Sequence, residues 1–237
     1  MELGLSGAVS QKIESFGELD LWLLGTDAIE EFNHHIYTVY NEAFGSTCGD
    51  PEVPMDEIAP AAFENFLRAR VCGVRHTSGE LVGTWGIIVN DLSKQESALP
   101  TEEKYNLDLN KIVSDMNAGS INFVFNGWRT AINKDALEKY NIDRTKSIFI
   151  FDLLLRGLMQ DFSERENEFL GIADMEKIVY KYHRRIGIPW HIVGEPINFW
   201  NRDRYPCAFK LGEFRDYMKT YHPERATFLF DKSKGVN

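Results

Sequence analysis

The chain has 237 residues, of which 43% are hydrophobic and 26% are charged. A chain of this length and apolar content can bury roughly 70% of the surface that its unfolded form exposes, which excludes the disordered, collagen-like and low-complexity classes. Lys and Arg total 26 against 36 Asp and Glu, so the net charge is −10. Because so acidic a protein repels phosphate backbones, we do not expect it to bind nucleic acid.

No segment offers the roughly 20 apolar residues that a membrane span requires. The longest apolar run, residues 147–159, is interrupted by Asp152 and Arg156. The first residues lack the basic stretch and apolar core of a secretory signal, and the three cysteines are few and odd in number. We therefore expect a soluble protein of the reducing cytoplasm, present as a monomer or a weak dimer.

A short apolar strand is expected at residues 19–26, followed by a helix. The helix should begin at Thr26 or Asp27, which are good N-caps, and end at Gly45. Its apolar residues recur at spacings of three and four and so share one stripe: Ile29, Phe32, Ile36, Val39, Tyr40 and Phe44.

Residues 46–60 contain three prolines and four carboxylates and predict an irregular acidic loop. Loops of this length in compact domains are often functional. After a helical stretch at 61–69, two β-rich runs at 71–75 and 81–89 flank a Ser-Gly turn and predict a hairpin. The polar stretch that follows should contain one short helix near 107–116.

The strand predicted at 121–132 is the most informative, because Ile121, Phe123 and Phe125 alternate onto one face. Gly127 lies inside it, where a glycine indicates a bulge or the close approach of another backbone. The remaining elements are expected to be a polar connection at 133–146, a buried helix at 147–162, a short strand at 169–173, a basic helix at 176–185, and β-like runs at 190–199 and 205–211 around a charged turn at 201–204.

The alternation of strands and helices predicts an α/β (α+β) fold. No repeat and no linker rich in Pro, Gly or Ser divides the chain. We therefore expect a single domain over residues 1–237, with a core at about 19–214 and a tail at 215–237.

Four segments carry a resemblance to a known family. Residues 126–132 read Asn-Gly-Trp-Arg-Thr-Ala-Ile and match, at the arginine and the apolar end, a motif of an acidic residue followed by Ser/Thr-Arg-Phe-Ala-Val. Phe44 matches the end of an early Arg-x-x-x-Phe, residues 182–188 match Phe-Tyr-x-x-Leu-Gly-Phe, and 194–211 match a closing hairpin. The chain thus resembles the GCN5-related N-acetyltransferase (GNAT) superfamily, and within it the acyl-homoserine-lactone synthases and long-chain N-acyl amino acid synthases.

The sequence departs from that family at several places. Asn126 stands where relatives have an acidic residue, and Tyr40 and Gly86 stand where they have arginines. The phosphate loop of ordinary acetyltransferases is absent between Ile132 and Ser147. These departures argue against a lactone product.

The resemblance implies a mixed central sheet whose central strands splay apart, flanked by helices. It also implies a fatty acyl donor, either the phosphopantetheine thioester of acyl carrier protein or acyl-coenzyme A, and a small-molecule amine as acceptor. Direct aminolysis is expected because no nucleophile motif is present. The alternative is a non-catalytic module of the same fold that binds an acyl thioester or a partner protein.

The candidate catalytic residues are Asn126, Arg129, Tyr182 and His183. Arg129 could hold the acyl carbonyl or a carboxylate, or it could be a surface or ion-paired arginine. Tyr182 and His183 compete for the position of the general acid, which the resemblance places here. For a histidine among Lys and Arg, simple exposure is the alternative.

Donor-binding residues are expected on the strand and at the start of the buried helix. A bulge at Gly127 would direct unpaired backbone groups toward a pantetheine, whereas a packing glycine is the alternative. Backbone N–H groups and two basic side chains at the helix start could hold a phosphate, or form an ordinary N-cap. The predicted donor-binding residues are Gly127, Trp128, Thr130, Ala131, Ile132, Arg144, Thr145, Lys146 and Ser147.

The acceptor site is predicted from Phe44, Phe125 and three acidic residues of the early loop, Asp50, Asp56 and Glu57. The acids could bind an amine or simply keep the loop soluble. No zinc spacing is present, and no permanently bound cofactor or metal is expected.

A basic helix stands out against the acidic background of the chain. Lys177, Lys181, Arg184 and Arg185 face only two acids between residues 174 and 185, which leaves a local charge of +2. We expect this helix to meet an acidic acyl carrier protein, with an ordinary solvated face as the alternative.

Overall fold

The computed structural model of the chain describes residues 7–48, 64–143, 146–159, 162, 165–199 and 201–231. Within these residues, the contacts divide the chain into two compact units. Unit 1 comprises residues up to Ile87 together with the segment from Trp128 to Asp161. Unit 2 comprises Ile88–Gly127 and Phe162–Asp231. Strands β4 and β5 contribute residues to both.

Unit 1 contains β1 (Gln11–Phe16), β2 (Leu19–Leu23), η1 (Thr26–Ala28), α1 (Ile29–Cys48), β3 (Ala69–His76), the first part of β4 (Leu81–Asp91), the second part of β5 (Phe123–Ile132), α5 (Lys134–Lys139) and α6 (Lys146–Met159). Unit 2 contains the remaining parts of β4 and β5 with α3 (Pro100–Tyr105), α4 (Leu109–Asp115), η2 (Glu166–Glu168), β6 (Phe169–Glu176), α7 (Lys177–Arg185), β7 (His191–Ile192), β8 (Ile197–Phe199), β9 (Arg202–Lys210), α8 (Leu211–Tyr221) and α9 (Pro223–Phe230).

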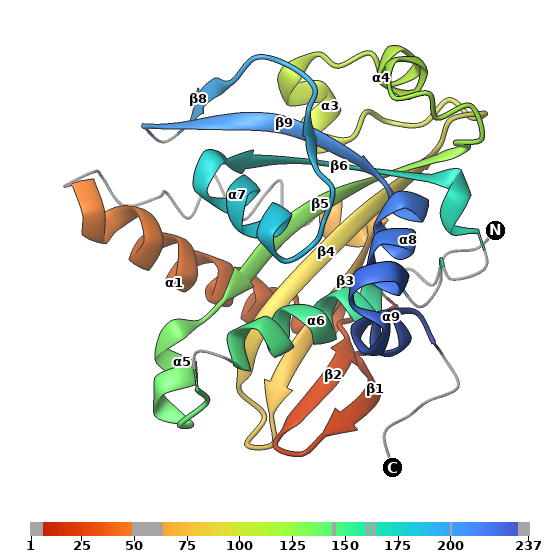
Figure 1. The fold of residues 1–237 in the computed structure, drawn as a ribbon. Coiled ribbons are helices and arrows are strands. Elements are labelled where there is room, and N and C mark those ends of the chain that lie inside the picture. Colours follow the sequence, from red (N-terminus) through yellow and green to blue (C-terminus); the bar gives the residue numbers. More distant parts are fainter. Residues whose placement is uncertain are drawn as a thin grey trace. The chain divides into compact units, whose positions relative to one another are not determined.

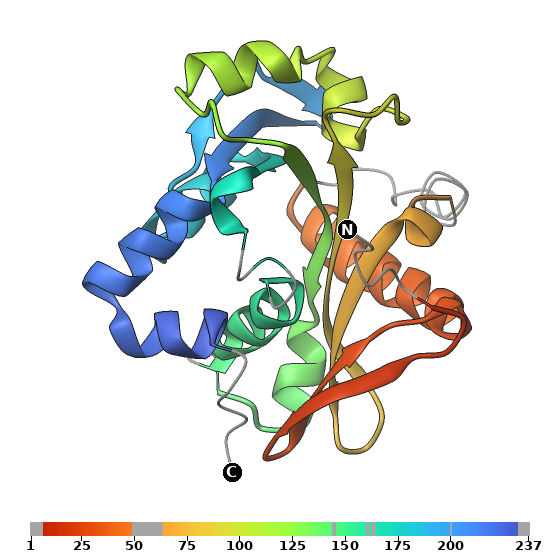
Figure 2. The same cartoon turned by 90° about the vertical axis from the view of Figure 1, so that its right-hand side faces the viewer.

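The sheet of unit 1 has the strand order β1-β2-β3-β4-β5, and helices cover both of its faces. Strand β2 is antiparallel to both β1 and β3. On one face α6 packs against β4, where the ring centroids of Trp85 and Phe151 lie 5.0 Å apart. On the other face α1 packs against β5, where Phe32 and Trp128 lie 5.5 Å apart (Figures 1 and 2).

The sheet of unit 2 has the order β5-β6-β9-β7, with β8 also pairing with β9. The β5–β6 pair is parallel and the others are antiparallel. Aromatic side chains from β5, β6, β9 and the segment after α6 form its core: Phe125, Phe162, Phe169 and Phe209. Helix α8 continues this core through Phe214, whose ring lies 5.7 Å from Phe230 of α9.

The predicted mixed α/β fold with flanking helices is confirmed, but several element boundaries were wrong. Helix α1 continues through Gly45 to Cys48. The connection after β5 contains α5, which Asn133 caps by accepting a hydrogen bond from the Ala136 N–H at 3.0 Å. The charged turn is shorter than predicted because β9 begins at Arg202.

Further elements were not predicted: β1, α3 and the two helices α8 and α9, which occupy most of the segment expected as a tail. Strand β1 is an edge strand of mainly polar residues, none of which is fully buried, so it lacks the apolar alternation that identifies a half-buried strand. Helix α3 begins with Pro100 and has only six residues, too few for a helical period to show. Among the described residues, no helix is long and apolar enough to cross a membrane.

Candidate functional site

The parallel ladder between β5 and β6 stops part way along both strands. It pairs Phe123 with Phe169 and ends with Asn126 opposite Ile172. Strand β6 nevertheless continues to Glu176, paired with β9, and β5 continues to Ile132. Among the described residues, therefore, no strand pairs with the β6-side edge of β5 from Gly127 onward. We call residues 127–132 on that side the free edge of β5.

The irregular backbone lies at Arg129, two residues beyond the predicted bulge. Arg129 has φ 51°, in the left-handed region, whereas Gly127 is not among the residues with positive φ. A non-glycine residue in this region costs about 1–2 kcal/mol, so the surrounding structure must hold it there. One such contact is the Thr84 hydroxyl, which donates to the Arg129 carbonyl at 3.4 Å.

The Arg129 side chain lies against two aromatic rings rather than a carboxylate. Its guanidinium carbon is 5.7 Å from the centroid of Tyr40 and 5.9 Å from that of Trp128. Among the described residues it has no ion pair. A half-buried guanidinium held by ring faces keeps its in-plane N–H donors available for a carbonyl or a carboxylate.

Gly86 is explained by its neighbour Trp128. A Cβ atom at Gly86 would lie 2.8 Å from Cε3 of the indole and 3.3 Å from the Trp128 carbonyl oxygen. The arginine of relatives therefore cannot be accommodated at this position while Trp128 keeps its place. The predicted donor-binding residue Trp128 is itself buried, as is Ala131, while Thr130 and Ile132 are half-buried.

Asn126 is buried, and both ends of its amide have partners. Its Oδ1 accepts from the Thr101 N–H at 2.8 Å, near the start of α3, and its Nδ2 donates to the Gly127 carbonyl at 2.6 Å. These contacts give Asn126 a structural role in unit 2. Its catalytic role remains a prediction. The candidate substrate residue Phe125 is also buried, with its ring 5.8 Å from that of Phe162.

His183 is buried on α7, so the alternative of an exposed helix histidine was wrong. Its side chain is 8% exposed, and burial lowers its pKa to about 4. The indole Nε1 of Trp190 donates to its Nδ1 at 3.2 Å, which places the proton of the neutral ring on Nε2. Neighbouring Tyr182 is exposed, so of the two candidates only Tyr182 presents its ring to solvent.

The described cysteines are poor nucleophiles. Cys72 and Cys207 are buried and form no disulfide with another described residue, and burial raises the pKa of the Cys207 thiol to about 12. A thiol with so high a pKa carries almost no thiolate at neutral pH. Neither residue therefore offers a route through a covalent acyl-enzyme.

Several predicted residues cannot be placed. Asp50, Asp56, Glu57, Arg144 and Thr145 lie outside the described residues. For Phe44, Lys146 and Ser147 only the backbone is described, Phe44 within α1 and the other two at the start of α6. The acidic acceptor loop and the phosphate cradle therefore stay predictions.

The basic surface of α7 is more positive than its sequence indicated. Its four cations are all exposed, although the Arg184 guanidinium donates to the Trp190 carbonyl at 3.0 Å. The two acids counted against them pair with cations elsewhere. Asp174 pairs with Lys104 and Arg204 at 2.8 and 3.0 Å, and Glu176 pairs with Arg202 at 3.0 Å.

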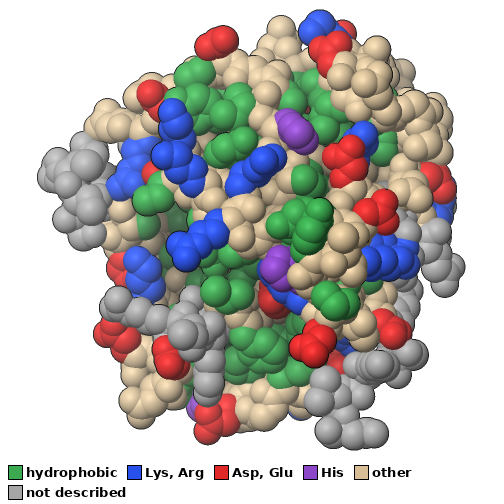
Figure 3. Space-filling model, in the orientation of Figure 1, with side chains coloured by type: hydrophobic (Ala, Val, Ile, Leu, Met, Phe, Trp, Pro, Cys, Tyr) green, Lys and Arg blue, Asp and Glu red, His purple; other side chains and the backbone are tan. Residues whose placement is uncertain are grey.

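Exposed apolar side chains lie among these cations, and sequence reasoning missed them. Ile178 is 71% exposed, Val179 38% and Tyr182 39%. Figure 3 shows Lys and Arg side chains gathered with hydrophobic ones over α7, β8 and β9. The spacing of three and four residues could have revealed that Ile178, Val179 and Tyr182 lie on one face of the basic helix.

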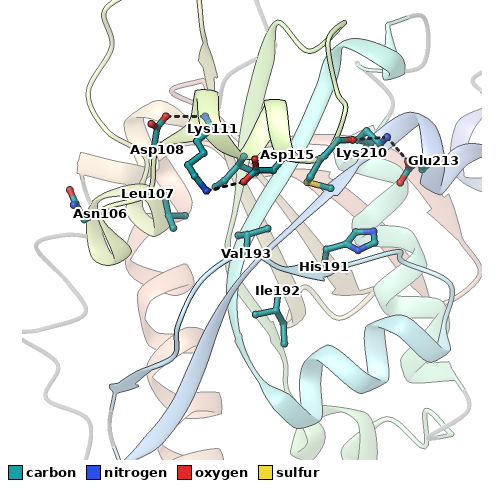
Figure 4. A pocket seen from close by; sticks show the side chains of 12 residues that line it. Asn106, Leu107, Asp108, Lys111, Asp115, His191, Ile192, Val193, Lys210 and Glu213 are labelled. Atoms are coloured by element: carbon teal, nitrogen blue, oxygen red, sulfur yellow. Dashed lines mark hydrogen bonds and ion pairs between the residues drawn. The ribbon is translucent and has the colours of Figure 1, made fainter.

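The sequence also gave no indication of a cavity of about 710 Å³ in unit 2. It lies beside α4, β7 and the end of β9 (Figure 4). The residues that line it are Asn106, Leu107, Asp108, Lys111, Ile112, Asp115, Met116, His191, Ile192, Val193, Lys210 and Glu213. Among the described residues, no group of His, Cys, Asp and Glu could hold a metal ion.

Comparison with known proteins identifies the fold. No family model and no curated protein matches the chain. An N-acyl amino acid synthase from uncultured soil microbes, FeeM, matches with 11% identity over 88% of this chain and 95% of its own, at a TM-score of 0.54. An uncharacterized protein of Bacillus halodurans matches with 9% identity over 93% of this chain and 100% of its own, at a TM-score of 0.52.

A mosquito protein assigned as arylalkylamine N-acetyltransferase 7, from Aedes aegypti, matches with 12% identity over 88% of this chain and 96% of its own, at a TM-score of 0.51. At such low identity these likenesses show a shared fold. The chain has the GNAT fold that its short motifs indicated.

Proposed function

We propose that this protein is an N-acyltransferase that moves a fatty acyl group from a thioester to the amino group of an amino acid or a similar amine. The observation that carries the proposal is the interrupted β5–β6 ladder, in a chain whose fold is shared with an N-acyl amino acid synthase. The free edge of β5 offers backbone groups that a pantetheine amide can pair with. Gly127, at its start, adds no side chain.

The reaction is a direct aminolysis. The amine nitrogen attacks the thioester carbonyl, the C–N bond forms, and the C–S bond then breaks as the tetrahedral intermediate collapses. Arg129 is suited to stabilise the oxyanion of that intermediate, because its guanidinium has ring faces but no described carboxylate as neighbours.

Proton transfer completes the exchange. The amine loses a proton, and the departing thiolate gains one. Tyr182 is the better candidate for the acid, because its ring is exposed whereas His183 is buried and neutral. A Tyr182→Phe variant should fold normally and turn over more slowly, with a loss of about 10²-fold or more in kcat if the hydroxyl is the acid.

Release of free thiol tests the activity. The full-length protein is incubated with acyl-coenzyme A or acyl carrier protein thioesters of several chain lengths and with a panel of amines. Amine-dependent thiol release from at least one pair is expected. Its absence for every pair would refute the transferase.

For the donor, we propose acyl carrier protein, with coenzyme A thioesters as the second choice. The exposed cations of α7 share the helix with exposed Ile178, and the acids beside them are neutralised by Lys104, Arg202 and Arg204. An acidic partner with a small apolar surface would complement this face in charge and in burial.

The second candidate is a binding module without catalysis. It is favoured by Asn126, whose amide makes structural hydrogen bonds at both ends where relatives have a charged group. Under this alternative a thioester raises the melting temperature and stays intact with every amine. If the protein is a transferase, the same thioester is consumed when a suitable amine is present.

A further inference from the structure

The cavity of unit 2 combines apolar walls with charged edges. Leu107, Ile112 and Met116 come from the segment around α4, and Ile192 and Val193 come from β7 and the residue after it. A volume of about 710 Å³ is within the range of small-molecule sites in proteins. The walls therefore suit a ligand with an apolar body.

The charges on this cavity form two groups, and Figure 4 shows Asp108, Lys111 and Asp115 to the left of Lys210 and Glu213. At the end of β9, Lys210 pairs with Glu213 at 2.5 Å and also donates to the Met116 carbonyl at 3.2 Å. This group carries one positive and one negative charge and is balanced.

The group on α4 is not balanced. Lys111 pairs with Asp115 at 2.9 Å, while its backbone N–H donates to Asp108 at 3.0 Å. The pKa of Lys111 is raised by the hydrogen bond that it donates to Asp115 and by the charges of Asp115 and Asp108. Asp115 thus pairs with the ammonium group of Lys111, whereas Asp108 accepts from its backbone N–H, and three carboxylates and two lysines are among the described residues that line the cavity.

From the apolar walls and this surplus negative charge, we infer that the cavity binds an amphipathic amine, with its ammonium group near Asp108 and Asp115 and its apolar body against Leu107, Ile112 and Val193. The ligand's ammonium shares the carboxylates with Lys111, which is exposed and can turn toward solvent.

This site is not where an amine would react with a thioester, and the inference goes beyond the proposed function. A surplus of carboxylate charge favours the protonated amine, which has no lone pair for attack. The cavity is therefore a binding site for an ammonium ligand, separate from the acyl-transfer chemistry.

Titration of the full-length protein with n-octylamine tests the inference without any thioester, so its outcome does not depend on acyl transfer. The matched probes are n-octanol, with the same body and no charge, and octanoate, with the opposite charge. We expect octylamine to bind with a Kd on the order of 1 mM or below and at least about fivefold tighter than octanoate. Equal or tighter binding of octanoate, or no binding of octylamine, would overturn the inference.

Two variants locate the ammonium group by effects of opposite sign. Asp108→Asn keeps an N-cap side chain on α4 but removes the charge, and should weaken octylamine about two- to fivefold. Lys111→Gln removes the competing cation and should tighten it by a similar factor. Asp91→Asn, which breaks an ion pair with Lys94 outside the cavity lining, should leave binding unchanged. If Asp91→Asn weakens binding as much as Asp108→Asn, or if Lys111→Gln weakens it, the assignment to this cavity fails.

Discussion

At the scale of single residues, Arg129 is the position where the backbone of β5 departs most from an ordinary strand. Its φ of 51° is strained for any side chain with a Cβ atom and is unstrained for glycine. Arg129→Ala and Arg129→Gly both remove the guanidinium, so their difference isolates the backbone effect. We expect the glycine variant to be more stable than the alanine variant by about 1 kcal/mol in urea unfolding. The reverse order, which ordinary strands show, would place Arg129 in a different conformation.

Two buried histidines predict how stability depends on pH. Burial lowers the pKa of His35 in unit 1 and of His183 in unit 2 to about 4 each. Between the ordinary value near 6.5 and about 4, the unfolded chain binds protons that the folded chain does not. Stability should therefore fall as the pH falls through this range, by up to about 3 kcal/mol for each histidine.

Unfolding in urea at pH 7 and pH 4.5 measures this effect. His183→Asn keeps an acceptor for the Trp190 indole but cannot gain a proton. The difference in stability between the two pH values should therefore be smaller in the variant than in the wild type, and carboxylates that titrate in the same range cancel in this comparison. Equal pH dependence in the two proteins would mean that His183 is protonated in the folded state as readily as in the unfolded chain.

At the scale of elements, the attachment of α3 depends on Asn126. Asn126→Ala would leave the Thr101 N–H and the Gly127 carbonyl without their side-chain partner, at a cost of about 2–3 kcal/mol. Asn133→Ala is a matched control, because Asn133 caps α5 through the Ala136 N–H in a less buried place. For Asn133→Ala we expect the free energy of unfolding to fall by about 1 kcal/mol. Equal losses at both positions would contradict the buried double role of Asn126.

The sequence predicted several elements that have a clear apolar period, but it missed α8, whose buried Leu211, Phe214 and Met218 recur at helical spacing. The β3–β4 hairpin, β5, α6 and α7 were all expected within a few residues of their bounds. Strand β1 and helix α3 were not expected, because polar edge strands and single-turn helices carry no such period. For the site, the sequence predicted a bulge or a close approach at Gly127, which follows the last paired residue of β5, whereas the left-handed conformation lies at Arg129, a residue type that sequence rules do not suggest there.

At the scale of the whole molecule, the net charge of −10 repels an acidic carrier protein. The exposed cations of α7 attract such a partner locally. Reversing the charge of Lys177 and Lys181 by substitution with Glu should slow turnover of a carrier-bound donor several-fold and change turnover of the coenzyme A thioester less. Because salt screens charges, this difference between the two donors should become smaller at high salt. Arg184 is left intact because it holds the Trp190 carbonyl.

Lys219→Glu on α8 is the control for this charge reversal, since it lowers the net charge at another exposed site of unit 2. Lys219→Glu should change the turnover of either donor only slightly. Equal slowing of both donors by the α7 variants, or none, would leave α7 as a solvated face.

The central claim is that the free edge of β5 holds an acyl thioester for transfer to an amine. The most direct measurement is mass spectrometric detection of the N-acyl amide formed by wild type, Gly127→Val and Gly119→Val from one thioester and one amine. Gly119 is a matched control, because a Cβ atom there meets nothing within 4 Å. The account predicts amide from the wild type and from Gly119→Val, and none from a folded Gly127→Val. Amide formation by Gly127→Val at the wild-type rate, or no amide from the wild type with any thioester and amine, would contradict it.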